Sequence, residues 1–312
     1  MISVIMSVYN EERKWIEQAV ISILEQSYSD LEFIIICDNP DIEDDIKEYL
    51  LLLERMNQNV IILWNEKNIG LAKSLNRGIE VAKGEYIARM DADDISDGER
   101  LRKELDFLIE NNYDLVSTNK INIDEESKWI SVDKDIVKNP NQVLLYGNII
   151  IHSSVLVKRK ILNVLGGYRE LINSEDWDLW LRMVEGGYTI GILNEPLLMY
   201  RVRYNSASIG RQLQQFYVSQ YIVKLHRERV RYGKDTFSVI NMNRYLKNKK
   251  ITNQKQRRFA RAYNYIQFAL KERENRRFIF CIINIIKAGY FFPPLVYRDL
   301  NSFVRILLKE RC

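Results

Sequence analysis

The feature that most constrains the fold is an alternation of apolar runs with helical segments over the first 91 residues. Four short runs rich in β-branched and aromatic residues indicate buried strands at 2–8, 31–37, 60–64 and 86–90. Helical segments separate them, as where Leu71, Leu75 and Ile79 recur at helical spacing. Strands that alternate with helices of about ten to fifteen residues form right-handed βαβ units with parallel strands. The sequence therefore predicts an α/β fold with a mostly parallel, Rossmann-like central sheet flanked by helices.

The alternation loosens in the middle of the chain, where a mixed arrangement is expected. After a helix that ends near Asn112, further apolar runs indicate strands at 114–119, 129–133, 149–157, 188–193 and 197–201. Helices are expected to begin at Pro140 and near Ser174. Helical patterns dominate from Ala207 onward. We therefore expect two domains, an α/β domain over residues 1–205 and a basic helical region over residues 206–312.

Acidic and amide side chains follow three of the predicted strands. Asn10 follows the first strand, Asp38 the second, and Asp91, Asp93 and Asp94 follow the fourth. Because open α/β sheets bind ligands at the carboxyl ends of parallel strands, these groups are expected to meet at one edge of the sheet. Mg²⁺ binds one or two carboxylates together with substrate phosphates, so this edge suggests a metal–diphosphate site that holds a nucleotide. For each acid taken alone, helix capping and turn chemistry is the alternative.

Charge is distributed unevenly along the chain. Residues 1–200 hold 36 acidic and 21 basic residues, whereas residues 201–312 hold 6 and 25. A basic block of this kind binds nucleic acid, anionic lipid or an acidic neighbouring domain, and charge alone does not choose among them. The three cysteines are far apart and odd in number, which favours a reducing cytosol. The first residues lack the basic and apolar regions of a signal peptide, so a cytoplasmic protein is expected.

A nearly continuous apolar stretch, residues 278–286, lies between Arg277 and Lys287. It is too short to span a bilayer, which needs about twenty residues. It is either a buried helix of a C-terminal bundle or an amphipathic helix in a membrane interface. We favour burial for the stretch itself. For the basic region around it we favour an anionic membrane over nucleic acid, because its positive charge exceeds what a solvated face needs.

Several short motifs occur in a defined order along the first two thirds of the chain. They are Met6-Ser-Val-Tyr9-Asn10, Asp38, Asn68-x-Gly70, Asn76-x-Gly78, Gly84-Glu-Tyr-Ile with Asp91-Ala-Asp93-Asp94, Gly166-Gly167-Tyr168, and Glu175-Asp176 with Trp180-Leu-Arg182. Together they closely resemble family 2 glycosyltransferases over roughly residues 1–205. The resemblance implies the GT-A fold, an inverting reaction, a nucleotide-sugar donor that is usually a UDP-sugar, and Mg²⁺ or Mn²⁺ on the donor diphosphate.

The same resemblance assigns roles to individual residues. Asp91 and Asp93 match the metal-binding Asp-x-Asp element, and Asp176 is similar to the general base, with Glu175 beside it to orient the base or bind acceptor. The implied nucleotide-sugar pocket includes Ser7, Tyr9, Asn10, Asp38, Asn68, Gly70, Lys73, Asp91, Ala92 and Asp93. The chemistry agrees, because sugar transfer needs a base for the acceptor hydroxyl and a cation on the leaving diphosphate. The alternative is that Ser174 caps the helix while Glu175 and Asp176 favour its dipole. The dipole is also expected to lower the pKa of a carboxylate, so a base at Asp176 would rely on position more than on basicity.

Two departures from the family pattern concern the donor site. Where many relatives have Tyr-Arg-x-His, with a histidine that reaches the metal or the diphosphate, this chain has Tyr200-Arg-Val-Arg203. Arginine does not ligate metal, but its guanidinium neutralises phosphate, so Arg203 is a candidate diphosphate ligand. The acidic loop lacks its usual small residues and reads Cys37-Asp-Asn-Pro40, which shifts the expected base contacts.

Three other side chains are interpreted as core. His152 lies on a predicted apolar strand, which favours a buried, hydrogen-bonded histidine. Trp177 and Trp180 have helical spacing, which favours packing over stacking on a sugar. The Gln-x-x-Arg-Trp element of processive family members does not occur in the sequence, which favours the addition of one sugar per encounter.

We therefore predict a metal-dependent, non-processive hexosyltransferase at the inner face of the cell membrane. It would use a nucleotide-sugar donor and a glycan or lipid-linked acceptor in the assembly of capsule, O-antigen or another surface glycan. A sugar nucleotidyltransferase is disfavoured because Ser7-Val-Tyr-Asn10 contains no glycine for a phosphate loop. A non-catalytic basic adaptor that binds membrane or RNA remains a second alternative. No nucleic-acid partner is expected, and a homo-oligomer is left open.

Overall fold

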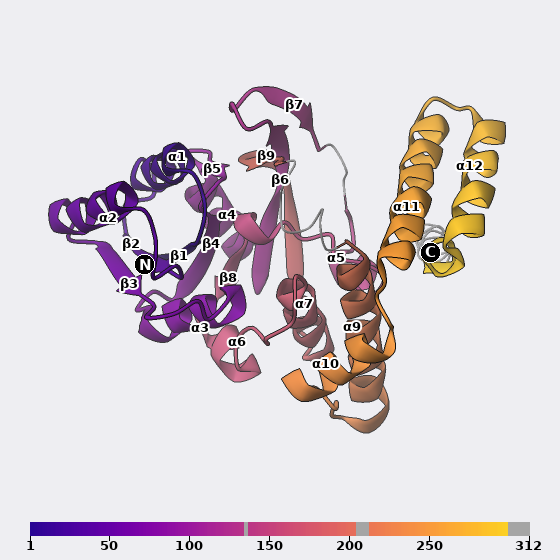
Figure 1. Ribbon diagram of the computed structural model, residues 1–312. Helices are drawn as coiled ribbons and strands as arrows, with labels where there is room; N and C mark the ends of the chain where they lie inside the picture. Colours follow the sequence, from indigo (N-terminus) through magenta and orange to yellow (C-terminus); the bar gives the residue numbers. More distant parts are fainter. Residues whose placement is uncertain (134–136, 204–211, 299–312) are drawn as a thin grey trace. The chain divides into compact units, whose positions relative to one another are not determined.

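A computed structural model describes residues 1–133, 137–203 and 212–298 (Figure 1). The chain forms two compact units. The first comprises Met1–Leu171 and Glu175–Ser206, and the second comprises Ile172–Ser174 and Ala207–Cys312.

The parallel half of the first unit follows the predicted alternation. Its strands are β1 (Ile2–Val8), β2 (Leu31–Cys37), β3 (Val60–Trp64) and β4 (Tyr86–Asp91). They pair in the order β3-β2-β1-β4, all parallel. The connecting helices are α1 (Arg13–Leu24), α2 (Asp44–Met56) and α3 (Leu71–Val81). The predicted parallel sheet with flanking helices is confirmed.

The two faces of β1 are buried under different helices. Val4 and Met6 belong to a core cluster that also contains Ile16 of α1 and residues of α2. The opposite face meets α3, where a Cβ on Gly78 would lie 2.7 Å from Ile5 Cγ2. Only glycine admits so close an approach. In Figure 1, α1 and α2 accordingly lie on one side of these strands and α3 on the other. This double burial explains why the strands are apolar throughout.

The other half of the sheet is mixed. Its strands are β8 (Leu156–Lys158), β6 (Leu115–Ile123), β9 (Ile190–Arg201), β5 (Ile95–Ser96) and β7 (Trp129–Val132). β8 pairs antiparallel with β4 and β6, β9 runs parallel to β6, and β5 and β7 are short antiparallel additions. The helices here are α4 (Arg100–Glu110), α5 (Pro140–Val143), α6 (Arg159–Leu165) and α7 (Glu175–Glu185).

Three of the predicted strands in this half are wrong in extent. The run 149–157 is not one strand, because the 3₁₀ turn η1 (His152–Ser154) interrupts it and only β8 is extended. The two strands predicted at 188–193 and 197–201 are one strand, β9, whose register against β6 shifts around Pro196. Proline donates no ladder hydrogen bond, so the irregularity falls where the sequence suggested a break.

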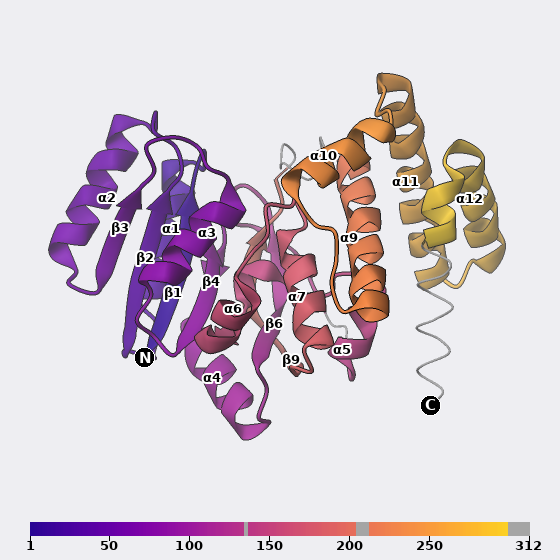
Figure 2. The ribbon, with the colours of Figure 1, turned by 90° about the horizontal axis from the view of Figure 1, so that it is seen from below.

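The second unit is helical. It contains α9 (Gln212–Tyr232), α10 (Val239–Asn248), α11 (Asn253–Glu274) and α12 (Phe278–Phe291). The rings of Phe216, Phe259 and Phe292 pack together with centroids 5.3–5.7 Å apart. α11 and α12 run side by side as a helical hairpin in both views (Figures 1 and 2).

The prediction that residues 278–286 are buried is wrong. Phe278, Ile279 and Phe280 are each more than half exposed, and much of α12 lies open to solvent. Within the described part of the chain, no helix combines the length and apolar character required to span a membrane.

Candidate functional site

The parallel strands bring the predicted donor-site residues to one edge of the sheet. Ser7 of β1 lies beside Ile36 of β2 on one side and Asp91 of β4 on the other. Tyr9 and Asn10 follow β1 and are exposed, and the Asn39 side chain bridges them by donating to Tyr9 O at 3.0 Å and Asn10 Oδ1 at 2.9 Å. The edge thus forms as the strand order predicts.

Asp38 organises the loop that closes this edge. Its buried carboxylate accepts hydrogen bonds of 2.8 Å from the backbone N–H groups of Ile69 and Gly70 and from Asn65 Nδ2. Gly70 has a φ of +85°, which favours glycine. Asp38 is therefore more than a local turn residue, since it accepts hydrogen bonds from residues 27 to 32 positions further along the chain.

The remaining donor-site candidates differ in exposure. Asn68 is exposed in the loop that Asp38 fixes, whereas Ala92 is buried. Lys73 is half-exposed on α3, and its ammonium lies 2.9 Å from Glu170 Oε2. Lys73 is thus held by an acid in this structure.

The acids after β4 sit in three different environments. Asp91 forms an ion pair with the buried Arg89. Burial acts to raise the pKa of Asp91, but the charge and hydrogen bond of Arg89 together with the charge of Arg203 and other neighbours lower it. Asp93 Oδ2 lies 2.8 Å from Arg203 Nε, yet burial and the neighbouring Asp91 raise the pKa of Asp93 to about 6. Asp94 is fully buried and accepts from Ser153 Oγ and Arg201 N.

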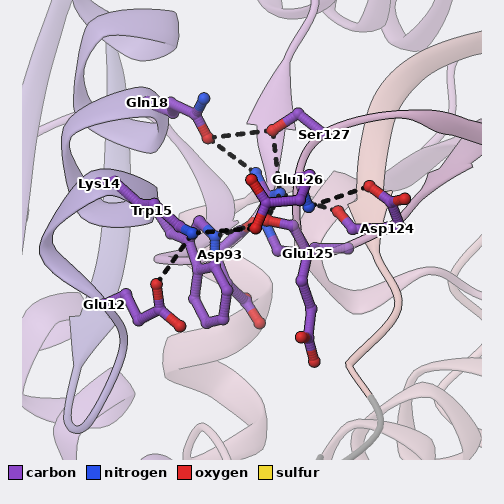
Figure 3. Close-up of polar contacts among 10 residues, drawn as sticks. Glu12, Lys14, Trp15, Gln18, Asp93, Asp124, Glu125, Glu126 and Ser127 are labelled. Carbon is purple, nitrogen blue, oxygen red and sulfur yellow. Dashed lines mark hydrogen bonds and ion pairs between the residues drawn. The ribbon is translucent and has the colours of Figure 1, made fainter.

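Arg201 fixes the backbone of this acidic turn. Its Nε donates to Asp93 O at 2.8 Å, and its other nitrogens reach the tip of the β6–β7 hairpin and helix α1 (Figure 3). These further acceptors are Asp124 O, Glu125 O, Ser127 Oγ and Gln18 Oε1. The guanidinium is buried over the Trp15 ring, and its hydrogen bonds to described residues go to backbone carbonyl, hydroxyl and amide oxygens. A single side chain thus joins two segments distant in sequence, the hairpin tip and α1, to the carbonyl of Asp93.

Asp176 and Glu175 occupy the first turn of α7. Asp176 Oδ2 accepts from Asn148 Nδ2 at 2.6 Å, and Oδ1 accepts from Trp177 N at 2.7 Å. Burial raises the pKa of Asp176 despite these bonds and outweighs the lowering expected from the helix dipole. Burial, followed by the charge of Asp176, raises the pKa of Glu175 to about 7. Two adjacent carboxyl groups in this turn therefore have raised pKa values, a feature common at functional sites.

A pocket of about 390 Å³ in the first unit connects the two groups of acids. Its lining residues are Asp91, Lys120, Asp133, Asn148, Ile149, Ile150, Ile151, His152, Ser153, Asp176 and Tyr200. Asp91 and Asp176 thus open into the same space, although they lie on different elements. The Lys120 ammonium lies 4.0 Å from the centroid of the Tyr200 ring. Lys120 and Asn148 carried no motif signal, and Tyr200, which begins the Tyr200-Arg-Val-Arg203 segment, was not predicted to line the site.

Of the three residues expected in the core, Trp177 and Trp180 are buried, whereas His152 is partly buried and lines the pocket. Trp180 is fully buried and Trp177 donates its indole N–H to Leu144 O at 2.9 Å, which confirms packing as their role. His152 Nε2 lies 3.0 Å from Tyr168 Oη. Burial and Arg89 lower the pKa of His152 to about 3, so it is neutral.

Comparison with known proteins explains this arrangement. The model of Glycosyl transferase family 2 matches residues 3–165. The chain belongs to this family. An uncharacterized glycosyltransferase of Methanocaldococcus jannaschii is 35% identical over 72% of this chain and 79% of its own length. The O-antigen biosynthesis glycosyltransferase WbnJ of Escherichia coli is 34% identical over 66% of this chain and 81% of its own.

Solved structures identify the fold of this family 2 glycosyltransferase as GT-A. S. aureus TarS 1–349 in complex with UDP-GlcNAc has a TM-score of 0.61 at 16% identity, covering 93% of this chain and 91% of that one. The mannosyltransferase PcManGT of Pyrobaculum calidifontis, in complex with GDP-Man and Mn²⁺, has a TM-score of 0.56 at 16% identity, covering 98% and 80%.

The acidic turn of this glycosyltransferase fits a divalent cation that is completed by substrate. Asp91 and Asp93 each keep one carboxylate oxygen outside their arginine ion pairs. Among the described residues, no cluster of three or more His, Cys, Asp or Glu side chains is placed to hold a metal. Mg²⁺ requires no such cluster, since it takes one or two carboxylates, waters and substrate phosphates. The donor set therefore suits a metal that arrives with a diphosphate.

Proposed function

We propose that this protein is an inverting glycosyltransferase that moves one sugar from a UDP-sugar to an acceptor hydroxyl. The observation that carries the proposal is the shared pocket of Asp91 and Asp176. Single displacement needs a leaving-group site and a base on opposite sides of the anomeric carbon. A pocket of about 390 Å³ between two such carboxylates has room for a sugar and an acceptor hydroxyl.

The donor is proposed to bind along the carboxyl edge of the parallel strands. The nucleoside would lie against Ser7, Tyr9 and Asn10 and the loop that Asp38 fixes, which contains Asn68 and Gly70. Lys73 and Ala92 border the same edge. The nucleotide-sugars named with TarS and PcManGT support a donor of this class, and we propose a UDP-sugar.

Metal and arginine are proposed to share the charge of the diphosphate. Mg²⁺ or Mn²⁺ would bind the open oxygens of Asp91 and Asp93 and stabilise the leaving group as a Lewis acid. Arg203 already lies 2.8 Å from Asp93 and is only 27% exposed. When the diphosphate enters, the Arg203 guanidinium can turn from Asp93 to a phosphate oxygen, a pairing that its geometry favours.

Asp176 is proposed to be the general base. The acceptor oxygen attacks the anomeric carbon, its proton passes to Asp176, and the bond from that carbon to the phosphate oxygen breaks with inversion. Asn148 holds the Asp176 carboxylate in place through a 2.6 Å hydrogen bond. Because burial raises the pKa of Asp176, the carboxylate is a stronger base than an exposed aspartate. Glu175 would orient this base or contact the acceptor.

The acceptor is proposed to be a lipid-linked surface glycan. This rests on similarity to relatives named for O-antigen and amylovoran biosynthesis. A lipid-linked acceptor places the enzyme at the inner face of the cell membrane. We propose that residues 1–205 bind donor and acceptor and carry out the transfer, and that residues 206–312 contact the membrane.

The proposal is tested by replacing each acid with its neutral isostere. Asp176→Asn should abolish sugar transfer but retain nucleotide-sugar binding, whereas Asp93→Asn should lose both. Asp106→Asn, at an exposed site on α4, is the matched control and should behave as wild type. Transfer of radiolabelled sugar from a panel of UDP-sugars to extracted lipid-linked glycans measures activity, and calorimetry measures binding. Full transfer by folded Asp176→Asn would remove that residue from its role.

A further inference from the structure

Helix α12 exposes a continuous apolar stripe. The residues recur with the spacing i, i+3, i+4, i+7 and i+11, which places them on one face of the helix. They and their exposed fractions are Ile279 (74%), Ile282 (57%), Ile283 (39%), Ile286 (67%) and Tyr290 (78%). Single exposed apolar residues are common on protein surfaces, but a row of five is typical of an interaction site.

The opposite face of α12 is already packed. Ala288 is fully buried, and the Phe291 ring stacks on Tyr265 of α11 with centroids 5.8 Å apart. The hairpin of α11 and α12 is therefore formed (Figures 1 and 2), and the stripe is a second apolar face that this contact leaves uncovered. The apolar sequence of residues 278–286 does not show which face of the helix is covered, and for this reason the whole stretch was predicted to be buried.

The charged residues within and directly around α12 in the sequence are all basic. Residues 275–298 contain four basic residues and no acidic residue. Arg276 and Arg277 are exposed immediately before α12, and Lys287 is exposed within it. Cations at a helix N-terminus oppose the helix dipole, so they do not serve the stability of α12. Among the described residues, the acidic partner of Arg277 is Glu272, at 3.8 Å.

The length of α12 selects how it meets a bilayer. Its 14 residues extend about 21 Å, which is less than the hydrocarbon thickness of about 30 Å. A helix with one apolar face and flanking cations lies in the plane of the interface, with its apolar side chains below the headgroups and its cations among them. The alternative is a dimer in which two copies of α12 pack through this stripe. Such a dimer would bring the basic residues of both copies together, and residues 275–298 contain no acidic residue to neutralise them.

We infer that α12 is an in-plane membrane anchor, which inserts the stripe from Ile279 to Tyr290 into a bilayer whose anionic headgroups pair with Arg276, Arg277 and Lys287. This inference identifies the element that makes the membrane contact proposed above. It does not depend on the catalytic site.

The test uses the full chain and flotation with vesicles of phosphatidylglycerol and phosphatidylcholine. Wild type should float with the anionic vesicles, and much less with phosphatidylcholine alone. Ile279→Gln/Ile286→Gln should lose at least tenfold in partitioning. Arg276→Gln/Arg277→Gln should bind less at low salt and lose most of its salt dependence. Met56→Gln on α2, at an exposed apolar site in the first unit, is the matched control and should float as wild type.

Three outcomes would overturn the inference. They are wild type that stays unbound to anionic vesicles at low salt, a stripe variant that floats as well as wild type, or a stripe variant that changes only the oligomeric state measured by light scattering. All variants should retain UDP-sugar binding by calorimetry. A loss of vesicle binding with donor binding intact therefore separates the anchor from the proposed sugar transfer.

Discussion

Lowering the pH through 6 is expected to weaken binding of a metal–nucleotide-sugar complex, because Asp93 becomes protonated. Burial, and then the charge of Asp91, raises the pKa of Asp93 to about 6, while Arg203 acts in the opposite direction. A carboxyl group must be ionised to bind a metal ion. The acid form of the protein therefore has to lose a proton before it binds, and affinity is present above this pKa and lost below it.

The size of the effect follows from the titration. With a pKa of about 6, Asp93 is ionised in about nine tenths of the molecules at pH 7 and in about one tenth at pH 5. Affinity should therefore fall roughly tenfold between these values, which corresponds to about 1.4 kcal/mol. Removal of the Arg203 charge, 2.8 Å from Asp93, should move the midpoint to higher pH, since this charge is the main influence that lowers the pKa of Asp93.

The assay is calorimetry with Mn²⁺ and UDP-glucose at pH 5, 6 and 7. A nucleotide-sugar is used because a terminal phosphate itself titrates with a pKa of about 6. Arg203→Gln should raise the midpoint, and Asp93→Asn should bind weakly with little pH dependence. Glu175→Gln removes a carboxyl group whose pKa is raised to about 7 and should leave the midpoint unchanged. A wild-type affinity that changes less than twofold from pH 5 to 7, in a chain that remains folded, would refute the reasoning.

Two further predictions concern buried arginine contacts. Asp178→Asn should lower the free energy of unfolding in urea by about 3 kcal/mol. The buried Arg182 guanidinium lies 2.8 Å from the Asp178 carboxylate, and the substitution leaves its charge beside a neutral group. An unchanged unfolding midpoint would contradict this. Arg201→Met should weaken nucleotide-sugar binding roughly tenfold, because the carbonyl of Asp93 loses the donor that fixes it. Calorimetry measures the loss, and wild-type affinity would show that the turn is held by other contacts.

Local sequence pattern was sufficient for the parallel half of the fold. Strands buried on both faces are apolar throughout, and each helix has one apolar stripe, so β1 to β4 are visible in the sequence. It was insufficient where backbone geometry depends on distant partners. The 3₁₀ turn at His152–Ser154 forms where Ser153 donates to Asp94, 59 residues away in sequence. The run 149–157 gives no sign of that bond.

Local pattern likewise misjudged electrostatics and exposure. The first-turn position of Asp176 implied a lowered pKa, but burial in a pocket to which Asn148 and Tyr200 contribute reverses the direction. The apolar stretch of α12 implied a core, yet its packing against α11 uses only one side of the helix. Hydrophobicity shows that a face avoids water, and it does not show which partner covers that face.

The sequence by itself determined the alternation of strands and helices, the place of Asp91 and Asp93 after a buried strand, and the basic character of the last hundred residues, because each is a property of neighbouring residues. The tertiary structure decided that Asp91 and Asp176 share a pocket, that Arg201 fixes the acidic turn, and that the stripe of α12 is open. These properties arise between residues far apart in sequence, where distance, burial and charge depend on how the chain packs.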